Sequence, residues 1–533
     1  MVKRIQQIVT IILALFIGLF IASSFFFRAK YNYSVYGDRA VLEGQQPLIF
    51  LLWIVVVLGL GFVLYRLSRK LEGYSRAKII PAVLLLSGIL QLVIIFLFTR
   101  MPTDDSQTVL SLAWAMLYDK DYSSFQSGGY LYMFPFNFSF VLYLKTLLLL
   151  FPDNYLVIKS FNILFSLVTT LVIYLLCQEL NPKSSRKDYG LLIVAATYVP
   201  ALFMSNFIYN DGIATALLTS ALYFAVRFIR RRSMKDILFA AVLLTLGNYF
   251  RSIGMIFLIA IVLGLLLNLR AIGVKKVMAA LGVTLLLWVL PAWIQNTALQ
   301  ATGIVDESPS SNSAPVYMWL NMGINLETLG FWDDRESYNI YQQEAGYNKA
   351  ESVELFKASI RSKLSGATLT ELAGMYYKKL VWTWTEGTYQ MERYGIGNEG
   401  ASSVGGRGGM VMGHYSYSTA ASRLFEGASM YRSSLLWAIY VQNFLMYVFI
   451  LIRLIRGLRT KRFAETPLLL VILGFIGFYL LWEIKSRYLY PVYPLLLVLS
   501  YLGVQDVYVL LTGTRRSRAC LKTRYCFQRI TVA

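Results

Sequence analysis

Two adjacent carboxylates, Asp104 and Asp105, follow a hydrophobic segment at about residues 79 to 98. They lie at the mouth of a membrane helix, where unpaired acids usually mark function. The dipole of that helix does not account for them, because a carboxylate at a helix C-terminus lies near the negative end. A bound cation, a substrate hydroxyl or a nearby Arg would each stabilise the pair. The alternative is a solvated loop, and the rest of the chain favours function.

The composition is that of a polytopic membrane protein. Of the 533 residues 57% are hydrophobic, the mean hydropathy is +0.56 and the formal net charge is +21, a combination that soluble domains do not show. A segment of about 20 apolar residues crosses the hydrocarbon core. Twelve such segments are predicted, near residues 8 to 27, 46 to 65, 79 to 98, 155 to 178, 190 to 207, 211 to 229, 237 to 250, 253 to 270, 277 to 295, 434 to 452, 467 to 483 and 488 to 511.

Lys and Arg predict the orientation of these spans, since cytoplasmic loops are enriched in basic residues. With the N-terminus inside, every loop that becomes cytoplasmic is basic, as in 66 to 78, 227 to 235 and 453 to 462. Both termini of a multi-pass cell-membrane protein are then cytoplasmic, and the acidic pair is extracytoplasmic. The positive charge is thus explained by anchors at an anionic leaflet. We expect no nucleic-acid partner, because the sequence has no basic groove interleaved with aromatic residues.

Other residue types exclude some classes of site. The single histidine, His414, excludes a multi-histidine zinc site. The cysteines Cys177, Cys520 and Cys526 fall in a span or in the cytoplasmic tail, so no disulfide framework is implied, and free thiols are favoured over palmitoylation. The first span lacks a small-residue cleavage site and is followed by further spans, which favours a retained signal anchor over a signal peptide.

A long segment at 99 to 154 is predicted to lie outside the membrane core. It contains an amphipathic helix around Ala113 to Leu117 and an apolar stretch, Pro135 to Phe151. We interpret this stretch as a helix that lies on or dips into the outer leaflet. Counting it as a full span would reverse every later loop and destroy the charge asymmetry.

A second segment, 296 to 433, is a polar insert with a predicted helix near 349 to 364. Its glycine-rich run, Gly405 to Gly409, lacks the Lys-Ser/Thr ending of a phosphate-binding loop, so a mobile lid or a linker is favoured. The chain therefore divides into two extra N-terminal spans (1–78), a core (79–295), the insert (296–433), C-terminal spans (434–511) and a basic tail (512–533).

Polar residues from five places in the chain share one predicted depth, the outer membrane boundary. Acids and cations at one depth suit an anionic lipid headgroup that is held by the cations, with a carboxylate to take a proton from a hydroxyl. The set comprises Asp104, Asp105, Asn210, Asp211, Asn248, Arg251, Glu483, Lys485, Arg487 and Tyr488.

The alternative for each residue is a side chain that snorkels to the interface or caps a helix. For Lys485 this alternative is favoured. It is weaker for Asp211, which lies in a turn of a few residues that needs no charge. Arg251 interrupts an otherwise apolar hairpin, so we expect its side chain to face a polar cavity.

These residues resemble the GT-C superfamily of polyprenyl-phosphate-sugar glycosyltransferases, especially the family-39-like group of protein O-mannosyltransferases and aminoarabinose transferases, with Gram-positive members. In that group an Asp-Glu pair begins a helix that ends in Met-Leu. Here Asp105 falls on the Asp and Met116-Leu117 on the end of the helix. The resemblance implies an all-α, GT-C-like polytopic fold in which Asp105 is the catalytic base and Asp104 its neighbour.

Later motifs follow in the order of that family. Tyr209-Asn210-Asp211 resembles the second acidic motif. Asn248 to Gly254 resembles a segment in which Lys or Arg precedes a turn, and this implies that Arg251 contacts the carrier phosphate. Glu483 to Pro494 resembles the Arg-Tyr-x-x-Pro-x-x-Pro start of a late span. Its implied substrate-binding residues are Glu483, Lys485, Arg487 and Tyr488.

Further patterns of the Gram-positive members occur at Gly128 to Pro135 and Met322 to Asn325, and the resemblance implies that Tyr130 and Asn137 bind substrate. Met133 to Asn137 departs from the family, because it replaces the Lys-Pro-Pro-Leu motif of the aminoarabinose transferases and lacks its phosphate-binding Lys.

The resemblance implies that a hexose passes from a polyprenyl-phosphate donor to a hydroxyl of a glycan, lipid or protein at the outer face. Because the carrier phosphate is a good leaving group, the protein need only bind it, align the acceptor and remove a proton, with inversion at the sugar carbon. Two acids could hold a divalent metal, but the resembled group does not require one, and we expect no metal and no other cofactor.

The competing interpretations are a flippase for a lipid-linked sugar and a secondary transporter of an envelope precursor. Twelve spans with both termini inside also fit a transporter. Transporters bind near the bilayer midplane and usually have paired repeats. This sequence has no such repeat, its charges gather at the outer boundary, and the single insert breaks any two-fold symmetry. These features favour the transferase.

Overall fold

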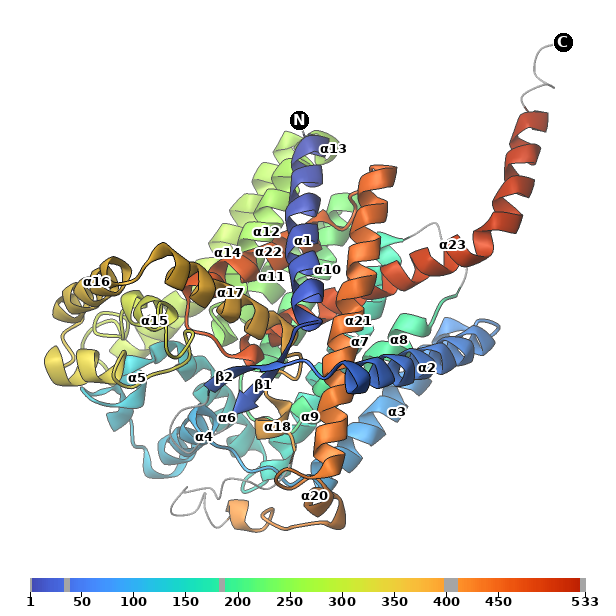
Figure 1. Ribbon diagram of the computed structural model, residues 1–533. Helices are drawn as coiled ribbons and strands as arrows, with labels where there is room; N and C mark the ends of the chain where they lie inside the picture. The colour runs from blue at the N-terminus through green and yellow to red at the C-terminus, as the bar shows by residue number, and fades with distance from the viewer. Residues whose placement is uncertain (1, 33–38, 182–186, 397–410, 528–533) are drawn as a thin grey trace.

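The computed structural model describes residues 2–32, 39–181, 187–396 and 411–527, with side chains as far as residue 511. It is predominantly helical (Figure 1), as predicted. Within these ranges eight helices are long and apolar enough to cross a membrane, or nine if one bent pair is a span. The eight are α1 (Val2–Ser24), α2 (Pro47–Leu71), α3 (Arg76–Leu97), α7 (Tyr155–Leu180), α10 (Asp211–Arg231), α14 (Val274–Ala301), α21 (Met430–Thr460) and the part of the chain at Ser486–Leu511 that leads into α23 (Tyr493–Phe527).

The predicted count of twelve spans is not confirmed. The segment near 190 to 207 is two short helices, α8 (Gly190–Ala196) and α9 (Val199–Met204). The chain breaks between them because Pro200 cannot continue α8 and fits the first turn of α9. Three further segments are helices of 17, 14 and 16 residues, shorter than a perpendicular crossing needs. They are α11 (Met234–Phe250), α12 (Gly254–Leu267) and α22 (Thr466–Leu481).

Segment 99–154 begins its helical part at the acidic pair. The amphipathic helix predicted around Ala113 to Leu117 is the end of a longer element that starts at Asp105. The apolar stretch that follows is bent by 101° against Ser123–Met133, the shape of a broken span or a re-entrant loop. The elements are α4 (Asp105–Trp114), the π-helix η1 (Ala115–Asp119), the 3-10 turn η2 (Ser123–Phe125), α5 (Tyr130–Met133), the 3-10 turn η3 (Pro135–Asn137) and α6 (Phe138–Leu150).

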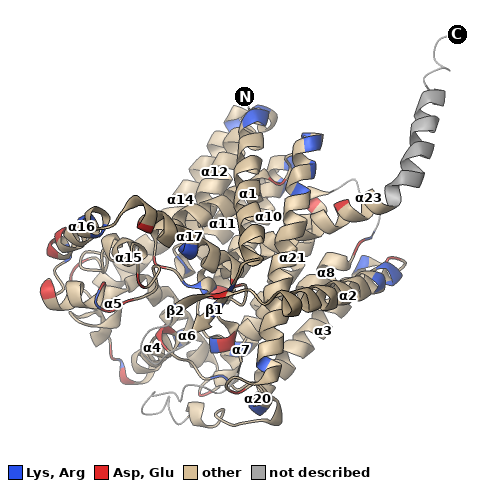
Figure 2. Cartoon of the chain, viewed as in Figure 1, with Lys and Arg blue, Asp and Glu red and all other residues tan. Residues whose placement is uncertain are grey.

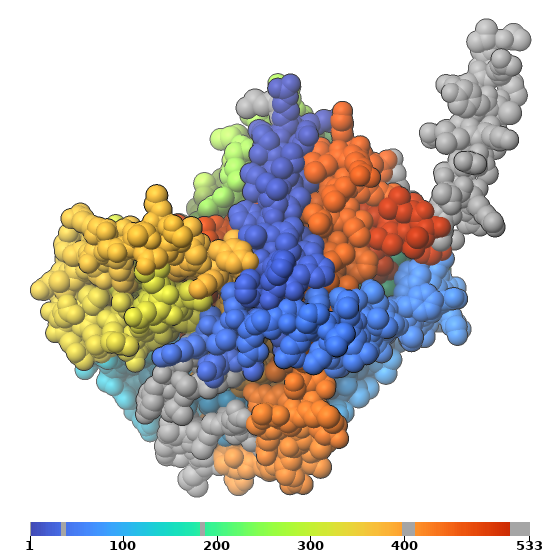
Figure 3. Space-filling view, viewed as in Figure 1, coloured from blue at the N-terminus to red at the C-terminus, as the bar shows by residue number. Residues whose placement is uncertain are grey.

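The part of the polar insert that contains α15 (Val316–Gly323) and α16 (Lys349–Gly366) forms a lobe to the left of α1 (Figure 3), whereas α20 (Ala420–Leu424) lies at the lower end of the molecule (Figure 1). The helix predicted near 349 to 364 is present as α16, whereas Gly405 to Gly409 lies outside the described residues. The elements of the insert are α15 (Val316–Gly323), the π-helix η4 (Asn339–Glu344), α16 (Lys349–Gly366), α17 (Leu369–Thr385), α18 (Met391–Tyr394) and α20 (Ala420–Leu424). Two short elements elsewhere are α13 (Leu269–Ile272) and the 3-10 helix η5 (Ser486–Val492).

A β-hairpin between the first two spans was not predicted. Strands β1 (Phe27–Asn32) and β2 (Arg39–Gly44) pair antiparallel, with Phe27 opposite Gly44. The Tyr31 ring packs edge-on against Trp382 of α17, with ring centroids 4.7 Å apart. Trp382 Nε1 donates to the carbonyl of Lys30 at 2.9 Å. The hairpin thus anchors the N-terminal spans to the insert.

Burial separates the core from the faces expected to meet lipid. Trp382 and Trp384 are among the largest fully buried side chains, whereas Leu48 and Val55 of α2 are 84% and 69% exposed. In Figure 2, Lys and Arg gather at the upper ends of α1 and α21 and at the far end of α2. Acidic residues are prominent over the insert and near α4, on the opposite side of the view. The helices therefore have a basic end and a more acidic end.

Candidate active site

The acidic pair lies at the start of α4. Asp105 is the first residue of the helix, where the positive end of the α4 dipole favours a carboxylate. The helix that precedes the pair does not supply this stabilisation, since its C-terminal end is negative. Asp104 makes no side-chain cap. Its carboxylate accepts hydrogen bonds from Arg393 Nε and Nη2, both at 3.0 Å, and from Tyr394 Oη at 3.2 Å. The two acids therefore have different partners.

Asp105 begins a chain of hydrogen bonds. Tyr130 Oη donates to Asp105 Oδ1 at 3.2 Å, and Asn137 Nδ2 donates to Tyr130 Oη at 2.7 Å. Tyr209 Oη donates to Asn137 Oδ1 at 3.2 Å. Asn137 and Tyr209 are both buried. The chain orients the Asp105 carboxylate and connects it to the loop that precedes α10.

Asp211 is held between two arginines, and we call these three residues the Asp211 cluster. Asp211 is the first residue of α10, where the helix dipole favours its charge. Arg251 Nη1 donates to Asp211 Oδ1 and, at 3.3 Å, to Asn210 Oδ1. Arg487 Nη1 lies 3.6 Å from Asp211 Oδ2. The side chains of Asp211 and Arg487 are 1% and 3% exposed, so the ions are almost fully removed from water.

The turn after Arg251 is fixed by close packing. Arg251 is the C-cap of α11 and has an extended backbone, so the chain turns directly into α12 at Gly254. A Cβ atom at Gly254 would lie 2.6 Å from Asn248 Cβ, closer than packed side chains allow. Only glycine fits this turn, and the turn directs Arg251 toward Asp211.

Glu483, Lys485 and Tyr488 form the next part of the site. Tyr488 Oη lies 3.1 Å from both carboxylate oxygens of Glu483, and Lys485 Nζ lies 4.0 Å from Glu483 Oε1. Burial raises the pKa of Glu483 above its usual range, although the nearby Lys485 charge and the Tyr488 hydrogen bond act in the opposite direction. This carboxyl therefore retains a proton to higher pH than an exposed Glu.

The insert and the hairpin hold this segment in place. Lys379 Nζ of α17 donates to the carbonyl of Trp482 at 2.7 Å. Burial lowers the pKa of Lys379 to about 7, with the Glu483 charge opposing the shift. On the other side, Ser486 N donates to Tyr31 Oη at 3.1 Å. Glu483 thus lies between two backbone positions that distant elements fix.

The guanidinium of Arg487 lies at the centre of an aromatic cage. It lies 5.0 Å from the ring centroids of Phe207 and Tyr209 and 5.2 Å from that of Tyr394. A fourth ring, Tyr488, lies at 5.7 Å. Such rings attract the cation and exclude water from it. Tyr209 belongs to the hydrogen-bond chain of Asp105, Tyr394 contacts Asp104, and Tyr488 contacts Glu483. All three parts of the site therefore meet at Arg487.

The structure brings all the predicted site residues except Asn248 into this connected group, and Asn248 lies beside the Gly254 turn. The residues are Asp104, Asp105, Tyr130, Asn137, Asn210, Asp211, Arg251, Glu483, Lys485, Arg487 and Tyr488. Sequence reasoning missed Arg393 and Tyr394, which reach Asp104 from the insert, and Phe207 of the cage. No pattern marks Arg393 and Tyr394, since they follow no apolar span and stand in a polar region.

Several polar atoms of the site have no hydrogen-bond partner among the described residues. They are Asp211 Oδ2, Arg487 Nε and Asn248 Oδ1, all buried. Buried polar groups are almost always satisfied, so unpartnered ones call for a reason. A ligand that supplies acceptors to a buried arginine would satisfy Arg487 Nε.

The carboxylates of the described site are not grouped as the ligands of a metal ion would be. In the described ranges, no three or more His, Cys, Asp or Glu side chains are grouped as they would be around a metal ion. The expectation about metals stays a prediction.

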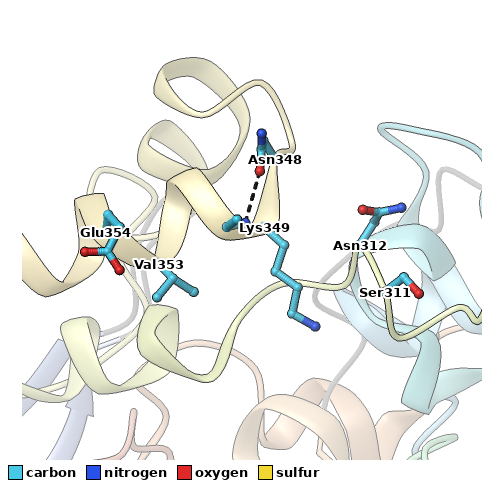
Figure 4. Close-up of a pocket in the computed structure, with 7 residues that line it drawn as sticks. Ser311, Asn312, Asn348, Lys349, Val353 and Glu354 are labelled. Atoms are coloured by element: carbon cyan, nitrogen blue, oxygen red, sulfur yellow. Dashed lines mark hydrogen bonds between the residues drawn. The ribbon is translucent and has the colours of Figure 1, made fainter.

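A separate pocket of about 480 Å³ lies in the insert and shares no residue with the site (Figure 4). Lys349 and the side chains of Asn312 and Asn348 line it, and Lys349 Nζ donates to the carbonyl of Ser310 at 2.6 Å. Its amides and hydroxyls could accept a polar ligand, but no charge of the site faces it.

Comparison with known proteins gives one family match. The family of dolichyl-phosphate-mannose-protein mannosyltransferases matches residues 135–294. This range includes Asn137, Asn210, Asp211 and Arg251 but neither the acidic pair nor the 483 to 488 segment. No curated protein matches the chain.

Among the solved structures that match is the archaeal oligosaccharyltransferase AglB from Archaeoglobus fulgidus, in complex with an inhibitory peptide and a dolichol-phosphate. The identity is 13%, the TM-score is 0.39, and the match covers 83% of this chain. The chain spans about half the length of that structure, 52%. The family match covers residues 135–294 of the 533 and supports the resemblance to GT-C glycosyltransferases that the sequence motifs indicate, within a predominantly helical, polytopic membrane architecture.

Proposed function

We propose that the protein transfers a sugar from a polyprenyl-phosphate-linked donor to an acceptor hydroxyl. The observation that carries this proposal is the caged Arg487, a buried cation whose Nε has no hydrogen-bond partner among the described residues. It is connected to the separate carboxylate of Asp105 through the side chains of Tyr209, Asn137 and Tyr130. One group can bind a phosphate and the other can take a proton. The family match supports this class of donor, because its members are described by a dolichyl-phosphate sugar.

The donor phosphate binds at the cationic side of the site. Arg487 and Arg251 both form ion pairs with Asp211, and Lys485 adds a third positive charge. Arginine stays charged when desolvated and grips phosphate through paired hydrogen bonds. Asp211 holds the two arginines in place without saturating them, which leaves Arg487 Nε for a phosphate oxygen.

The acceptor hydroxyl loses its proton to Asp105. Its oxygen attacks the anomeric carbon as the bond from that carbon to the phosphate oxygen breaks, and polyprenyl phosphate leaves with the electron pair. The proton passes to Asp105, whose carboxylate Tyr130 orients. One displacement inverts the anomeric carbon and needs no covalent intermediate with the protein.

The charge distribution supports an extracytoplasmic site with both termini in the cytoplasm. Asp211 begins α10, whereas Arg230 and Arg231 lie in its last turn. α2 likewise ends in Arg69 and Lys70. If these basic ends lie in the cytoplasm, the acidic start of α10 opens to the opposite face.

The test offers the purified protein one donor type at a time. We expect transfer from a polyprenyl-phosphate sugar to a hydroxyl acceptor and none from a nucleotide sugar. Transfer from the nucleotide sugar would overturn the proposed donor. Movement of the lipid-linked sugar across vesicles without any transfer would establish the flippase instead.

A further inference from the structure

The insert reaches the acidic pair through Arg393. This residue lies in α18, 289 positions after Asp104 in the chain, and its guanidinium grips both oxygens of the Asp104 carboxylate. The Arg393 side chain is 20% exposed and that of Asp104 is 45% exposed. Paired, parallel hydrogen bonds of this kind fix direction as well as distance. The contact therefore constrains where Asp104 lies relative to the insert.

The backbone of Asp104 needs such a constraint. Its φ is 56° and its ψ is −139°, a combination that residues with a Cβ atom rarely adopt. Asp at the N-cap of a helix usually has an extended backbone and accepts a hydrogen bond from the next turn. Here the side chain makes no cap hydrogen bond, because it turns away to Arg393. Local preference alone would not select this conformation.

The position of Arg393 is itself built into the fold. Buried Glu386 accepts hydrogen bonds from the backbone of Thr388 at 3.0 Å and of Tyr389 at 3.2 Å. Beyond Arg393, a Cβ atom at Gly395 would lie 2.7 Å from the carbonyl oxygen of Phe203. The segment that carries Arg393 is therefore fixed on both sides and can serve as a reference point.

Tyr394, the next residue after Arg393, connects the acidic pair to Arg487, the proposed phosphate-binding cation. Tyr394 Oη donates to Asp104 Oδ2, and the Tyr394 ring faces the guanidinium of Arg487 at 5.2 Å. The same ring packs 4.2 Å from the Phe207 ring. One segment of the insert thus contacts both the acidic pair and the proposed phosphate-binding cation.

We propose that Arg393 is a positioning residue: by holding Asp104 in its strained backbone conformation, it sets the start of α4 and aims the Asp105 carboxylate at the acceptor. Asp104 is then a structural partner and Asp105 alone takes the proton. The inference deepens the proposed transferase function and rests on it. It gives the insert a role in the chemistry that its sequence does not reveal.

The kinetic test replaces Arg393 with Gln and with Lys. We expect Arg393→Gln to lower kcat by about 10- to 100-fold, the scale of a misplaced catalytic group. KM for the lipid-linked donor should stay within about twofold, because no donor-binding group is lost. Arg393→Lys should recover part of kcat, since it keeps the charge but loses the fork. The matched control is Arg335→Gln, which breaks an exposed ion pair with Asp333 in the same insert and should leave both constants unchanged.

The second test uses the backbone. Glycine adopts the φ of Asp104 without strain, so Asp104→Gly should keep at least about tenfold more activity than Asp104→Ala. In the Asp104→Gly background the further change Arg393→Gln should have little additional effect. Equal loss in the Gly and Ala variants, down to the level of Asp105→Asn, would make Asp104 itself catalytic and overturn the proposal.

A stability measurement separates this inference from the proposed function. In the protein that keeps Asp104, Arg393→Gln should lower Tm by about 2 to 4 °C. In the Asp104→Gly variant the same change should lower Tm by less than about 1 °C. If the wild type transfers no sugar, the proposed function fails, while this difference between backgrounds still reports whether Arg393 holds Asp104. Equal Tm losses in both backgrounds would overturn the positioning role.

Discussion

Two clusters of buried charge lie at opposite ends of α22, and they differ in how completely they are paired. One is the Asp211 cluster. The other, the Asp506 cluster, consists of Arg453, Arg456, Glu465 and Asp506. Arg453 Nη1 and Arg456 Nη1 lie 3.0 and 2.9 Å from the two oxygens of Asp506, and Arg453 Nε donates to Glu465 at 3.1 Å.

The two clusters differ in the number of buried polar atoms that have no hydrogen-bond partner among the described residues. No side-chain atom of the Asp506 cluster is among the buried polar atoms without a partner in the described chain, whereas the Asp211 cluster contributes Asp211 Oδ2 and Arg487 Nε. Two cations and two acids complete each other in the first case. In the second, two arginines share one acid, and Arg487 Nε has no acceptor among the described residues. A fully paired cluster stabilises the fold, and an incomplete one is suited to a ligand.

The largest expected effect concerns the carboxylate that neither cluster contains. Asp105→Asn should fold and insert normally but lose about two or more orders of magnitude in turnover, the usual scale for deleting a general base. Purified variants are compared by initial rates of transfer from a polyprenyl-phosphate sugar. If Asp105→Asn retained near wild-type transfer while Asp104→Asn lost it, the base would be Asp104. Full activity in both variants and in the double variant would reject a base in this pair.

Arg251→Gln should remove one of the two arginines that pair with Asp211 and that we propose to bind the phosphate of the sugar donor. One charge-assisted hydrogen bond to phosphate is lost, so kcat/KM for the lipid-linked donor should fall by about 10- to 100-fold. Asp211 keeps Arg487 as a partner, so the variant should still fold. The comparison variant is Arg456→Gln in the Asp506 cluster, for which we expect lower stability and an unchanged donor KM. An unchanged kcat/KM in Arg251→Gln would remove Arg251 from the donor site.

The sequence located most of the site because the length of an apolar span fixes the depth of the charged residue next to it. Asp105, Asp211, Arg251 and Arg487 each stand at such an end, so their depth could be predicted without knowing any contact. Their partners could not. Arg393 meets Asp104 only through tertiary structure, and nothing in a polar insert distinguishes it from other surface arginines.

For the fold, the sequence predicts where the apolar segments are but not where they break. Hydropathy identifies an apolar segment but not its break, so α8 and α9 were taken as one span. The 27 to 44 hairpin is short and lies between two spans, where its alternation of side chains is too brief to distinguish from a loop. It is stabilised by Trp382, which belongs to a segment more than three hundred residues away.

Asp506→Asn should reduce stability without changing the chemistry. The substitution removes the charge of the carboxylate that pairs with Arg456, whereas Arg453 keeps its second acid, Glu465. Losing one member of a fully buried pair costs about 3 to 5 kcal/mol. These arginine side chains are 21% and 33% exposed, so water screens them and a loss of about 1 to 2 kcal/mol is expected. Thermal unfolding in detergent at a fixed scan rate measures the loss, and turnover per folded molecule should match the wild type. A fall in that turnover would show that the two clusters are coupled.

A smaller effect should appear in the pH dependence of stability. Burial raises the folded-state pKa of Glu483, so between the ordinary Glu pKa of about 4.3 and the raised value the native state binds more protons than the unfolded state. Stability should then fall as pH rises through this window. Glu483→Gln, which cannot ionise, should flatten that part of the Tm profile. Identical profiles for the two proteins would show that folding leaves the pKa of Glu483 unchanged.

The smallest expected effect is that of metal removal. Positive charge for the donor phosphate already comes from Arg251, Arg487 and Lys485, and the Asp104 carboxylate is engaged by Arg393. A divalent cation held by both acids of the pair would have to displace Arg393 from Asp104. Transfer should therefore continue at the same rate after exhaustive chelation, with added Mg²⁺ or Mn²⁺ giving no stimulation. Loss of activity on chelation and its recovery with one metal would assign the acidic pair to metal binding, and the charge that completes the Asp211 cluster would then arrive as a metal–phosphate complex rather than as phosphate alone.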